Sequence, residues 1–441
     1  MKVLFISLGC DKNLVDSEVM LGLLAEKGYQ MTDDETEAEV IVINTCCFIH
    51  DAKEESIQTI LEMAEYKKEG TLKALIVTGC LAQRYQQEIL DEIPEVDEVL
   101  GTTSYPEIVD AIENALKGRA EVRMTDIDAL PLVDTARQVT TGGHFAYLKI
   151  AEGCDKHCTY CIIPKIRGNY RSVPMERLIK EAKGLAEKGV KELILVAQET
   201  TLYGKDLYGE KSLHRLLKEL CRISGIRWIR ILYCYPEEID DNLIQVMKEE
   251  PKICHYVDLP IQHANTDILK RMGRRTSKEQ LEEIIGKLRR EIPDIAIRTT
   301  LITGFPGETE EQHQELVDFV DEMEFDHLGV FTYSPEEDTP AAEMEGQIPE
   351  EVKEDRQAEI MELQQEIAFE QAEDMVGKEV LVMIEGKVAD ENAYVGRTYK
   401  DAPNVDGLIY VNTEEELMSG DFARVKVTGA AEYDLIGELI S

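Results

Sequence analysis

Short apolar runs alternate with amphipathic stretches over the first 117 residues. The apolar runs predict buried strands, and the stretches between them carry apolar residues at helical spacing. The strands are expected at residues 3–8, 40–44 and 73–78, and the helices at residues 16–27, 52–68 and 81–92. Strands that alternate with helices in this way form a parallel sheet with helices on both faces. We therefore predict a doubly wound α/β domain over residues 1–117.

The same alternation continues over residues 142–371, after a linker at residues 126–143 that contains Pro131 and two glycines. Six strands are expected, at residues 146–150, 192–197, 228–234, 256–260, 296–303 and 328–333. Helices are expected between them, at residues 175–188, 212–223, 237–248, 278–290 and 309–322. Six such units predict a partial (β/α)6 barrel with its active site at the carboxyl ends of the strands. A long polar helix over residues 350–374 follows.

The pattern changes to alternating apolar and polar residues in the last region, residues 374–441. Five short strands are expected, at residues 378–385, 393–398, 407–411, 423–427 and 435–440. Glycine-containing turns separate them, as is typical of a small antiparallel β-barrel of OB-like shape.

Composition narrows the class of protein. The chain has 441 residues, of which 43% are hydrophobic and 31% are charged, which is typical of a globular protein rather than a disordered one. No apolar run approaches the roughly 18 residues of a membrane span. The apolar stretch at the N-terminus is too short for a signal peptide, so we expect a cytoplasmic protein without membrane contact.

The net charge is −40, from 48 Lys and Arg against 88 Asp and Glu. An acidic surface repels phosphate backbones and attracts basic partners. The alternative is that these charges only solvate the helix faces.

Three of the ten cysteines stand on one short segment as Cys154, Cys158 and Cys161, directly after the strand expected at residues 146–150. In a reducing compartment such cysteines indicate metal ligands or catalytic thiols rather than disulfides. Three thiolates on one loop can hold three irons of a cubane iron–sulfur cluster and leave the fourth iron open for catalysis. The alternatives are a zinc site, with His157 or a remote thiol as fourth ligand, and a thioredoxin-like pair that leaves the third cysteine unexplained.

Each of the first three expected strands ends in a cysteine, and these are Cys10, Cys46 and Cys80. In an open parallel sheet, ligands bind outside the carboxyl ends of the strands. The three thiols are therefore expected to meet at one edge and to hold a second metal cluster. The alternative is three inert core cysteines. Cys47 would point the other way along its strand, so we interpret it as structural.

With both cysteine sets and the small β-barrel in view, the chain resembles the methylthiotransferase family of radical S-adenosylmethionine (SAM) enzymes. The segments that carry the resemblance are residues 7–18, 44–46, 78–80, 154–167 and 303–308. It covers essentially the whole chain. It implies a flavodoxin-like N-terminal domain, a radical-SAM core and a C-terminal TRAM domain.

The resemblance also implies two 4Fe-4S clusters and SAM as cofactors. The ligands of the SAM-binding cluster would be Cys154, Cys158 and Cys161, and those of an auxiliary cluster would be Cys10, Cys46 and Cys80. One SAM would methylate a sulfur on the auxiliary cluster, and another would be split to a deoxyadenosyl radical. That radical would take a hydrogen from the substrate carbon, which then captures the methylthio group. No separate acid or base is expected, because the cofactor performs the hard step.

Side chains at the predicted strand ends are candidate SAM contacts. Gln198 and Glu199 would face the ribose or amino group, Arg298 would pair with the SAM carboxylate, and Gly304 would lie nearby. Tyr160 would lie against adenine. The alternative is that these residues only form pairs or packing within the fold. In the common radical-SAM pattern, Gly-Gly-Glu follows the second strand, whereas Ala197-Gln198-Glu199 stands here.

Two substrate classes occur in the family: an adenosine of tRNA, and an aspartate of ribosomal protein S-twelve. Residues 7–18, 161–168 and 396–407 are similar to the second group, called RimO. Residues 377–441 also carry a net charge of −7, which suits a basic protein better than RNA. Asp401 and Asp406 are expected on an exposed, glycine-bounded loop where they would meet this partner.

The predicted function is therefore insertion of a methylthio group at the β-carbon of an aspartate of the ribosomal protein. The resemblance further implies an electron donor such as flavodoxin or ferredoxin, and we expect a monomer. The alternatives are a tRNA-adenosine methylthiotransferase and a non-catalytic iron–sulfur or zinc scaffold.

Overall fold

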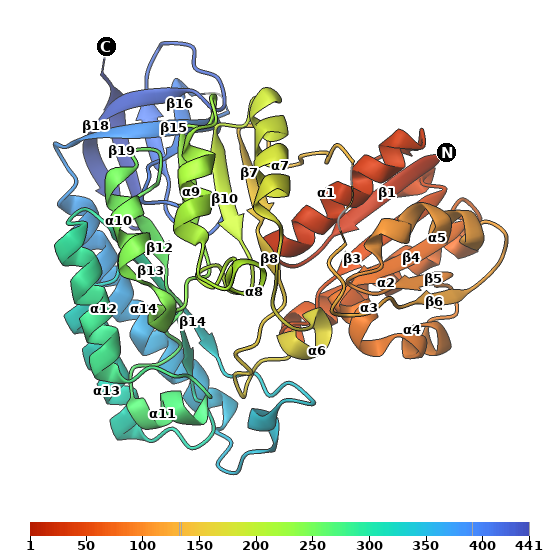
Figure 1. The fold of residues 1–441 in the computed structure, drawn as a ribbon, viewed down its shortest axis with the longest axis horizontal. Helices are drawn as coiled ribbons and strands as arrows, with labels where there is room; N and C mark the ends of the chain where they lie inside the picture. The colour runs from red at the N-terminus through yellow and green to blue at the C-terminus, as the bar shows by residue number, and fades with distance from the viewer. Residues whose placement is uncertain (132, 134, 390, 441) are drawn as a thin grey trace. The chain divides into compact units, whose positions relative to one another are not determined.

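Two units make up the fold in the computed structural model, which describes residues 1–131, 133, 135–389 and 391–440 (Figure 1). The first unit contains Met1–Thr140, Ala151–Val173 and Glu336–Thr339. The second contains Thr141–Ile150, Pro174–Pro335 and Pro340–Ser441. All six cysteines of the two predicted sets therefore belong to the first unit.

The first unit is built on a six-stranded parallel sheet with the strand order β2-β1-β3-β4-β5-β6. Its strands are β1 (Lys2–Ser7), β2 (Gln30–Met31), β3 (Val40–Thr45), β4 (Ala74–Gly79), β5 (Glu98–Leu100) and β6 (Glu121–Arg123). Its larger helices are α1 (Asp11–Glu26), α2 (His50–Glu69), α3 (Cys80–Tyr85), α4 (Gln87–Glu92) and α5 (Ile108–Ala115). Neighbouring side chains of β3 point to opposite faces, so that Ile41 and Ile43 enter one core while Val40 and Val42 enter the other. The predicted doubly wound sheet is confirmed.

Several short elements of this unit were not predicted from the sequence. β2, β5 and β6 have two or three residues each, too few to show a period in the sequence. The single helix expected over residues 81–92 is two helices, because Gln86 adopts a left-handed backbone with φ 43° between α3 and α4.

The second unit contains six strands close to the predicted positions. They are β7 (Phe145–Lys149), β10 (Glu192–Val196), β11 (Trp228–Ile231), β12 (Tyr256–Asp258), β13 (Ala296–Thr303) and β14 (His327–Thr332). All neighbours pair in parallel within two groups, β7-β10-β11 and β12-β13-β14, and a bridge between Ile229 and Ile253 leads from the first group towards the second. This is the predicted partial barrel.

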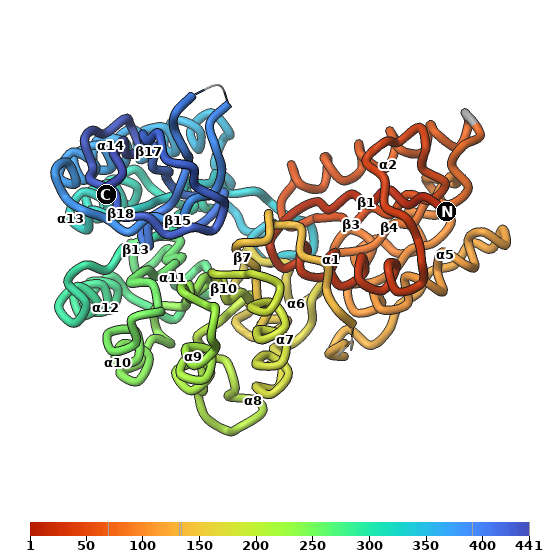
Figure 2. The backbone as a smooth tube through the Cα atoms, turned by 90° about the horizontal axis from the view of Figure 1, so that it is seen from above, coloured from red at the N-terminus to blue at the C-terminus, as the bar shows by residue number. Residues whose placement is uncertain are grey.

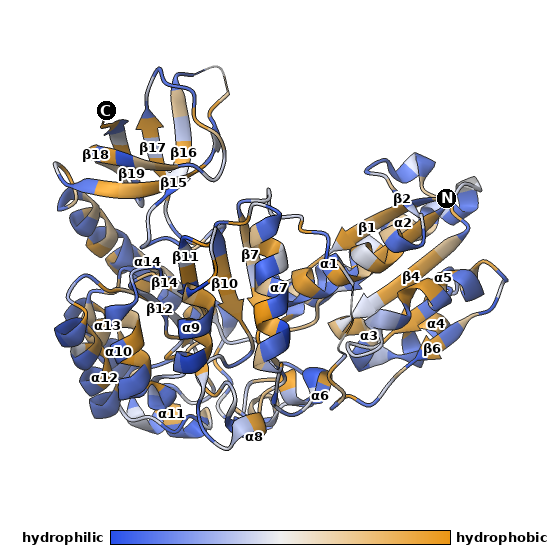
Figure 3. Cartoon of the chain, turned by 45° about the horizontal axis from the view of Figure 1, so that its top comes forward, coloured by the Kyte–Doolittle hydropathy of each residue, from blue (hydrophilic) through white to orange (hydrophobic). Residues whose placement is uncertain are grey.

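Helices cover the outer side of these strands, and most of the longer ones are amphipathic. They are α7 (Met175–Glu187), α9 (Leu213–Cys221), α10 (Asp241–Glu249), α12 (Lys278–Glu291), α13 (Glu310–Met323) and α14 (Glu350–Glu373), with the short α8 (Lys205–Tyr208) and α11 (Thr266–Arg271). α7, α9, α10 and α12 follow one another along the strands (Figure 2). α12 and α13 carry both polar and apolar residues, whereas β10 is mostly apolar (Figure 3). None of the described helices combines the length and the apolar character needed to cross a membrane.

A closed five-stranded barrel forms the C-terminal part of the second unit. Its strands are β15 (Glu379–Lys387), β16 (Ala393–Arg397), β17 (Ile409–Asn412), β18 (Phe422–Ala431) and β19 (Asp434–Leu439). Alternate residues such as Val382, Ile384, Val425 and Val427 fill its core. The predicted small barrel is confirmed, with one addition. β17 and β19 pair in parallel, while the other neighbours are antiparallel.

A buried set of charges joins this barrel to the strands of the partial barrel. The carboxylate of Glu192 accepts hydrogen bonds from Arg230 (Nε, 2.8 Å) and Arg397 (Nη2, 2.7 Å). None of the three side chains is exposed to solvent. Burial alone would raise the pKa of Glu192, but the two arginines together lower it below its usual value. Glu192 therefore stays ionised, and together with Glu385, which accepts from the Nε of Arg397 (2.6 Å), it compensates both cations.

The loop between β16 and β17 corrects one prediction. The side chain of Asp406 is buried and that of Asp401 is only 13% exposed, so neither reaches solvent as predicted. Asp406 accepts hydrogen bonds from Tyr256 (2.7 Å) and Arg298 (Nε, 3.2 Å), and Asp401 lies 3.5 Å from His327. The glycines around the loop suggested exposure. The partners Tyr256, Arg298 and His327 come from strands 74 to 150 residues away in the sequence and left no local signal. Glu192, Tyr256 and His327 are each the first residue of a strand, so the C-terminal barrel lies against the amino ends of the partial barrel.

We expect Glu192→Gln to destabilise the protein by about 3–5 kcal/mol, because it removes the charge that compensates the buried Arg230 and leaves Arg397 with Glu385 alone. Urea unfolding at neutral pH measures this loss. Glu379→Gln is the matched control, since Glu379 is exposed on the C-terminal barrel and its replacement should cost less than about 0.5 kcal/mol. Equal stability of the two variants would contradict the role of the buried cluster.

Candidate functional site

Three adjacent parallel strands of the first unit each lead into a cysteine. Cys10 caps the N-terminus of α1 after β1, Cys46 follows β3, and Cys80 begins α3 directly after β4. β3 pairs with β1 on one side and with β4 on the other. The carboxyl ends of all three strands therefore meet at one edge of the sheet, as predicted from the sequence.

Two glycines allow the backbone to turn at this edge. Gly9 has φ +85°, and a Cβ there would lie 2.8 Å from the Cβ of Cys46 and 3.0 Å from its sulfur. Gly79 has φ +91°, and a Cβ there would lie 2.6 Å from the carbonyl oxygen of Thr45. Contacts this short do not occur between real atoms, so only glycine lets the cysteine loops approach each other so closely.

A polar network beneath the cysteines holds these loops in place. The amide of Asn13 donates to the carbonyl oxygens of Leu8 (3.1 Å) and Thr45 (2.9 Å), which links the ends of β1 and β3. Asn44 donates to the carbonyl oxygen of Asn13 (3.0 Å). Ser56 accepts from the backbone N–H of Cys46 and donates to its carbonyl oxygen. The role of these three polar residues was not predicted from the sequence, although Asn13 and Asn44 stand within three residues of Cys10 and Cys46.

The thiols at this edge interact with one another. Burial raises the pKa of Cys46 to about 12, and the neighbouring Cys80 and Cys10 contribute to the rise. Burial likewise raises the pKa of Cys80, partly offset by Arg167. Without a metal these thiols stay protonated at neutral pH, whereas metal ligation requires thiolates and releases the protons. Cys47 packs in the hydrophobic core beside Leu81, in agreement with its structural interpretation.

The second set of cysteines lies on a loop between two short strands, β8 (Ala151–Glu152) and β9 (Arg171–Ser172), which pair antiparallel. The N–H of Cys154 donates to the carbonyl oxygen of Gly168 (3.1 Å), and that of Cys161 to the carbonyl oxygen of Cys158 (3.0 Å). Cys154 and Cys158 are buried and Cys161 is partly exposed. The loop is therefore closed on itself at its base and turns its third cysteine towards the surface.

A short helix joins the two sets. α6 (Ile163–Arg167) follows the Cys154 loop and contacts α3, which begins at Cys80. Ile162 and Ile166 belong to the same hydrophobic core as Leu81, and Thr102 donates to the carbonyl oxygen of Ile166 (2.9 Å). The two cysteine sets are thus parts of one packed unit.

Each of the two cysteine sets offers three soft sulfur donors, the ligand type that holds iron–sulfur clusters. Within the described part of the chain, no three Cys, His, Asp or Glu side chains already surround one ion position. A four-iron cluster spreads its ligand sulfurs over its own width, so thiols that serve it need not gather around one point. His157, the fourth ligand considered for zinc, is exposed in a left-handed conformation with φ 53°.

The candidate SAM contacts lie after the carboxyl ends of two strands and on the Cys154 loop. Gln198 and Glu199 follow the carboxyl end of β10, and the buried carboxylate of Glu199 accepts from the N–H of Thr201 (2.9 Å). Gly304 follows β13 with φ +68°, and a Cβ there would lie 2.3 Å from the side chain of Lys353. Packing against Lys353 is therefore sufficient to require glycine at this position. Tyr160 is partly exposed on the Cys154 loop.

Arg298 stands apart from these residues. It is the third residue of β13, near the amino end of the strand, and pairs with Asp258 (Nη1, 3.1 Å) and Asp406 (Nε, 3.2 Å). Active sites of such barrels lie at the opposite, carboxyl ends of the strands. This placement favours the structural alternative over a contact with the SAM carboxylate.

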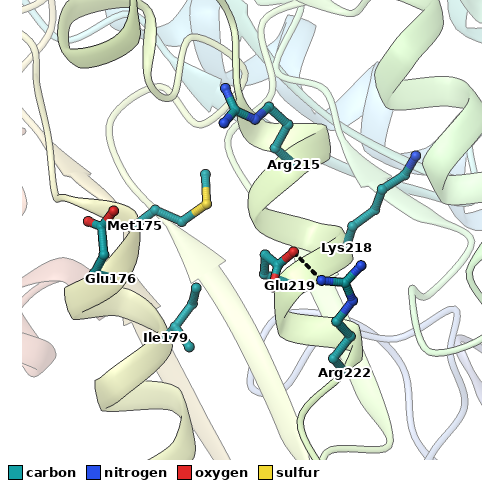
Figure 4. A pocket seen from close by; sticks show the side chains of 7 residues that line it. All are labelled: Met175, Glu176, Ile179, Arg215, Lys218, Glu219 and Arg222. Atoms are coloured by element: carbon teal, nitrogen blue, oxygen red, sulfur yellow. Dashed lines mark hydrogen bonds and ion pairs between the residues drawn. The ribbon is translucent and has the colours of Figure 1, made fainter.

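An open hollow of about 320 Å³ on the second unit does not coincide with any candidate residue (Figure 4). It lies between α7 and the segment of α9 that carries Arg215 and Lys218, on the outer helices of the partial barrel. Glu219 pairs with Arg222 at its rim. Its place on the outer helices separates it from the carboxyl ends of the strands.

Comparisons with known proteins agree with this organisation. Three family models match the chain: the uncharacterized protein family UPF0004 over residues 2–101, the radical SAM superfamily over residues 148–320, and the TRAM domain over residues 376–440. A protein of Lachnoclostridium phytofermentans, named ribosomal protein uS12 methylthiotransferase RimO, is 68% identical over 437 residues, 99% of either chain. Proteins of the same name from Desulfitobacterium hafniense and Clostridioides difficile are 50% and 51% identical over 440 residues.

Solved structures add a comparison of folds. The radical SAM methyltransferase TsrM from Kitasatospora setae, solved with cobalamin and a [4Fe-4S] cluster, matches with a TM-score of 0.55 at 15% identity. The match covers 77% of this chain and 76% of that one. The cobalamin-dependent radical SAM enzyme OxsB matches with a TM-score of 0.52 at 13% identity, over 82% of this chain and 56% of that one. At these identities the likeness concerns the fold alone.

We expect Gly9→Ala to lose close to half of the iron and sulfide bound after anaerobic reconstitution, because the added methyl group displaces Cys46. Gly28→Ala is the matched control. Gly28 also has a positive φ (+83°), but a Cβ there meets nothing within 4 Å, so the variant shares the backbone strain without the overlap. Full iron content in Gly9→Ala would show that the close approach of Gly9 and Cys46 is not needed.

Proposed function

The chain belongs to the RimO family of ribosomal protein uS12 methylthiotransferases, and we propose that it inserts a methylthio group at the β-carbon of an aspartate of that ribosomal protein. It is a radical SAM methylthiotransferase, and its cofactors are SAM and [4Fe-4S] clusters. The reaction replaces an unactivated C–H bond by C–S–CH3. The overall chemistry is a transfer of a sulfur-containing group.

The observation that carries this proposal is the pair of three-cysteine sets in one unit. We propose that Cys154, Cys158 and Cys161 hold the cluster that binds SAM, and that Cys10, Cys46 and Cys80 hold the auxiliary cluster. The donor sets suit this assignment, since each offers three soft sulfur ligands and leaves a fourth iron open. When bound, SAM and the clusters supply the radical and sulfur chemistry, while the residues of this chain place the two sets and exclude water.

The proposed SAM contacts follow from position along the strands. Gln198, Glu199 and Gly304 directly follow the carboxyl ends of β10 and β13, and Tyr160 stands between two proposed cluster ligands. We retain these four as proposed contacts. We assign Arg298 to the junction with the TRAM domain, because its guanidinium is neutralised by Asp258 and Asp406.

The TRAM domain is the proposed docking surface for the basic substrate. Its net charge of −7 disfavours RNA, whose phosphates require basic contacts. The acidic residues that reach solvent differ from those predicted, since Asp401 and Asp406 are internal. Glu414, Glu415 and Glu416 form an exposed run between β17 and β18 and replace them in the proposal.

The proposal also covers the electron donor, the oligomeric state and the location in the cell. We propose a reduced flavodoxin or ferredoxin as electron donor, and a monomeric enzyme in the cytoplasm. All ten cysteines are free of disulfides, which accords with a reducing compartment.

Mass spectrometry of the ribosomal protein and of tRNA, after incubation with reconstituted enzyme, SAM and a reductant, tests the proposed substrate. We expect a methylthio group on one aspartate of the protein and none on tRNA. Modified tRNA with unmodified protein would establish the tRNA-adenosine alternative. Bound zinc without iron would establish the scaffold.

Variants of the two sets separate their roles. Replacing Cys154, Cys158 or Cys161 by Ala should abolish formation of deoxyadenosine, because two thiolates hold a site-differentiated cluster poorly. Replacing Cys10, Cys46 or Cys80 by Ala should retain deoxyadenosine and lose the methylthiolated product. Cys221→Ala is the control, since Cys221 lies on α9 outside both sets and should leave both products unchanged. Full product from Cys46→Ala would refute the assignment of the auxiliary cluster.

Reversal of the exposed acidic run should weaken substrate docking. We expect Glu415→Lys with Glu416→Lys to slow association with the ribosomal protein and to reduce its dependence on salt, while deoxyadenosine formation stays normal. The same double reversal at Glu181 and Glu187 on α7 keeps the net charge equal and serves as control. Association that responds equally to both pairs would mean that only total charge matters.

A further inference from the structure

Arg167, at the end of α6, extends its guanidinium into the first unit, where only 2% of the side chain is exposed. The Nε–H donates to the sulfur of Cys80 at 3.4 Å. Nη1 donates to Asp16 (2.8 Å) and Glu152 (3.3 Å), and Nη2 donates to the side-chain oxygen of Asn13. One side chain thus connects the segment after the Cys154 set with a proposed ligand of the other set.

The charge of this group is permanent. A guanidinium stays protonated in proteins, and the carboxylates of Asp16 and Glu152 stabilise its charge in this buried place. The two carboxylates do not merely neutralise it, because they also fix its plane. With Nη1 held by Asp16 and Glu152 and Nη2 by Asn13, the remaining Nε–H points at the sulfur.

The helix that carries Arg167 is itself held in place. Ile166 is buried in the core beneath α3, and its carbonyl oxygen accepts from Thr102. Thr102 is in turn held by Gln83 of α3, which accepts from its N–H (3.0 Å). The packing of Ile166 and the two hydrogen bonds of Thr102, to the carbonyl oxygen of Ile166 and from its N–H to Gln83, therefore fix the position of Arg167 relative to Cys80.

We propose that Arg167 is a positioning residue for the auxiliary cluster, which holds Cys80 in its ligating orientation and raises the reduction potential of that cluster. This rests on the proposed function, in which Cys80 is a cluster ligand. A hydrogen bond donated to a ligand sulfur stabilises the more negative, reduced state of the cluster. Lysine cannot replace arginine here, because an ammonium lacks the planar fork that serves four acceptors at once.

The test measures the potential of the auxiliary cluster alone. In the full-length chain with Cys154, Cys158 and Cys161 replaced by Ala, a redox titration followed by electron paramagnetic resonance reports only that cluster. Adding Arg167→Lys should shift its midpoint to a more negative potential while the iron content is kept. Arg123→Lys is the control, since Arg123 pairs with Glu98 in the same unit and contacts no cysteine. An unchanged midpoint in Arg167→Lys would overturn the proposal.

A second measurement needs no substitution of Arg167. Pulsed electron paramagnetic resonance of the reduced cluster, in protein labelled with ¹⁵N-arginine, should show coupling to one arginine nitrogen. Absence of this coupling would also overturn the proposal. A chain that forms no cluster at all on Cys10, Cys46 and Cys80, even with Arg167 intact, would instead refute the proposed function on which the inference rests.

Discussion

The parallel alignment of β1, β3 and β4 is the constraint on which the chemistry of this protein depends. Parallel strands bring all their carboxyl ends to one edge, so residues 34 to 36 positions apart in the sequence become neighbours. The chain uses this by placing a cysteine after each strand. The glycines before Cys10 and Cys80 then allow the loops to approach each other more closely than any other residue would permit.

In the second unit, the amino ends of the strands hold the contacts with the C-terminal barrel. The amino ends of β10, β12 and β14 carry charged and polar groups that meet the TRAM domain. Strand β16 supplies Arg397 and the loop after it supplies Asp401 and Asp406, each paired with a group of opposite charge or a hydrogen-bond donor. The TRAM domain is therefore part of the internal polar structure of the enzyme as well as a proposed surface for its substrate.

Much of this organisation could be predicted from the sequence. Strands with period-two or continuously apolar patterns, such as β3 and β13, were located within one or two residues, and both cysteine sets followed from their spacing. Contacts between distant charged residues could not be predicted. The strand predicted at residues 296–303 already placed Arg298 near its amino end, but only the fold shows that Asp406 lies beside it. Arg167 gave no local signal either, because its partners lie in α1, β8 and α3.

The Glu192 cluster has a consequence for the exchange of domains between related enzymes. A TRAM domain grafted from a relative of different substrate preference would meet Glu192 and Arg230 in the recipient. Unless the donor barrel supplies a hydrogen-bond donor at the position of Arg397, the graft would leave the second carboxylate oxygen of the buried Glu192 without the partner that it has here. Chimeras that aim to redirect substrate choice should therefore transfer the charged strand-start residues together with the barrel.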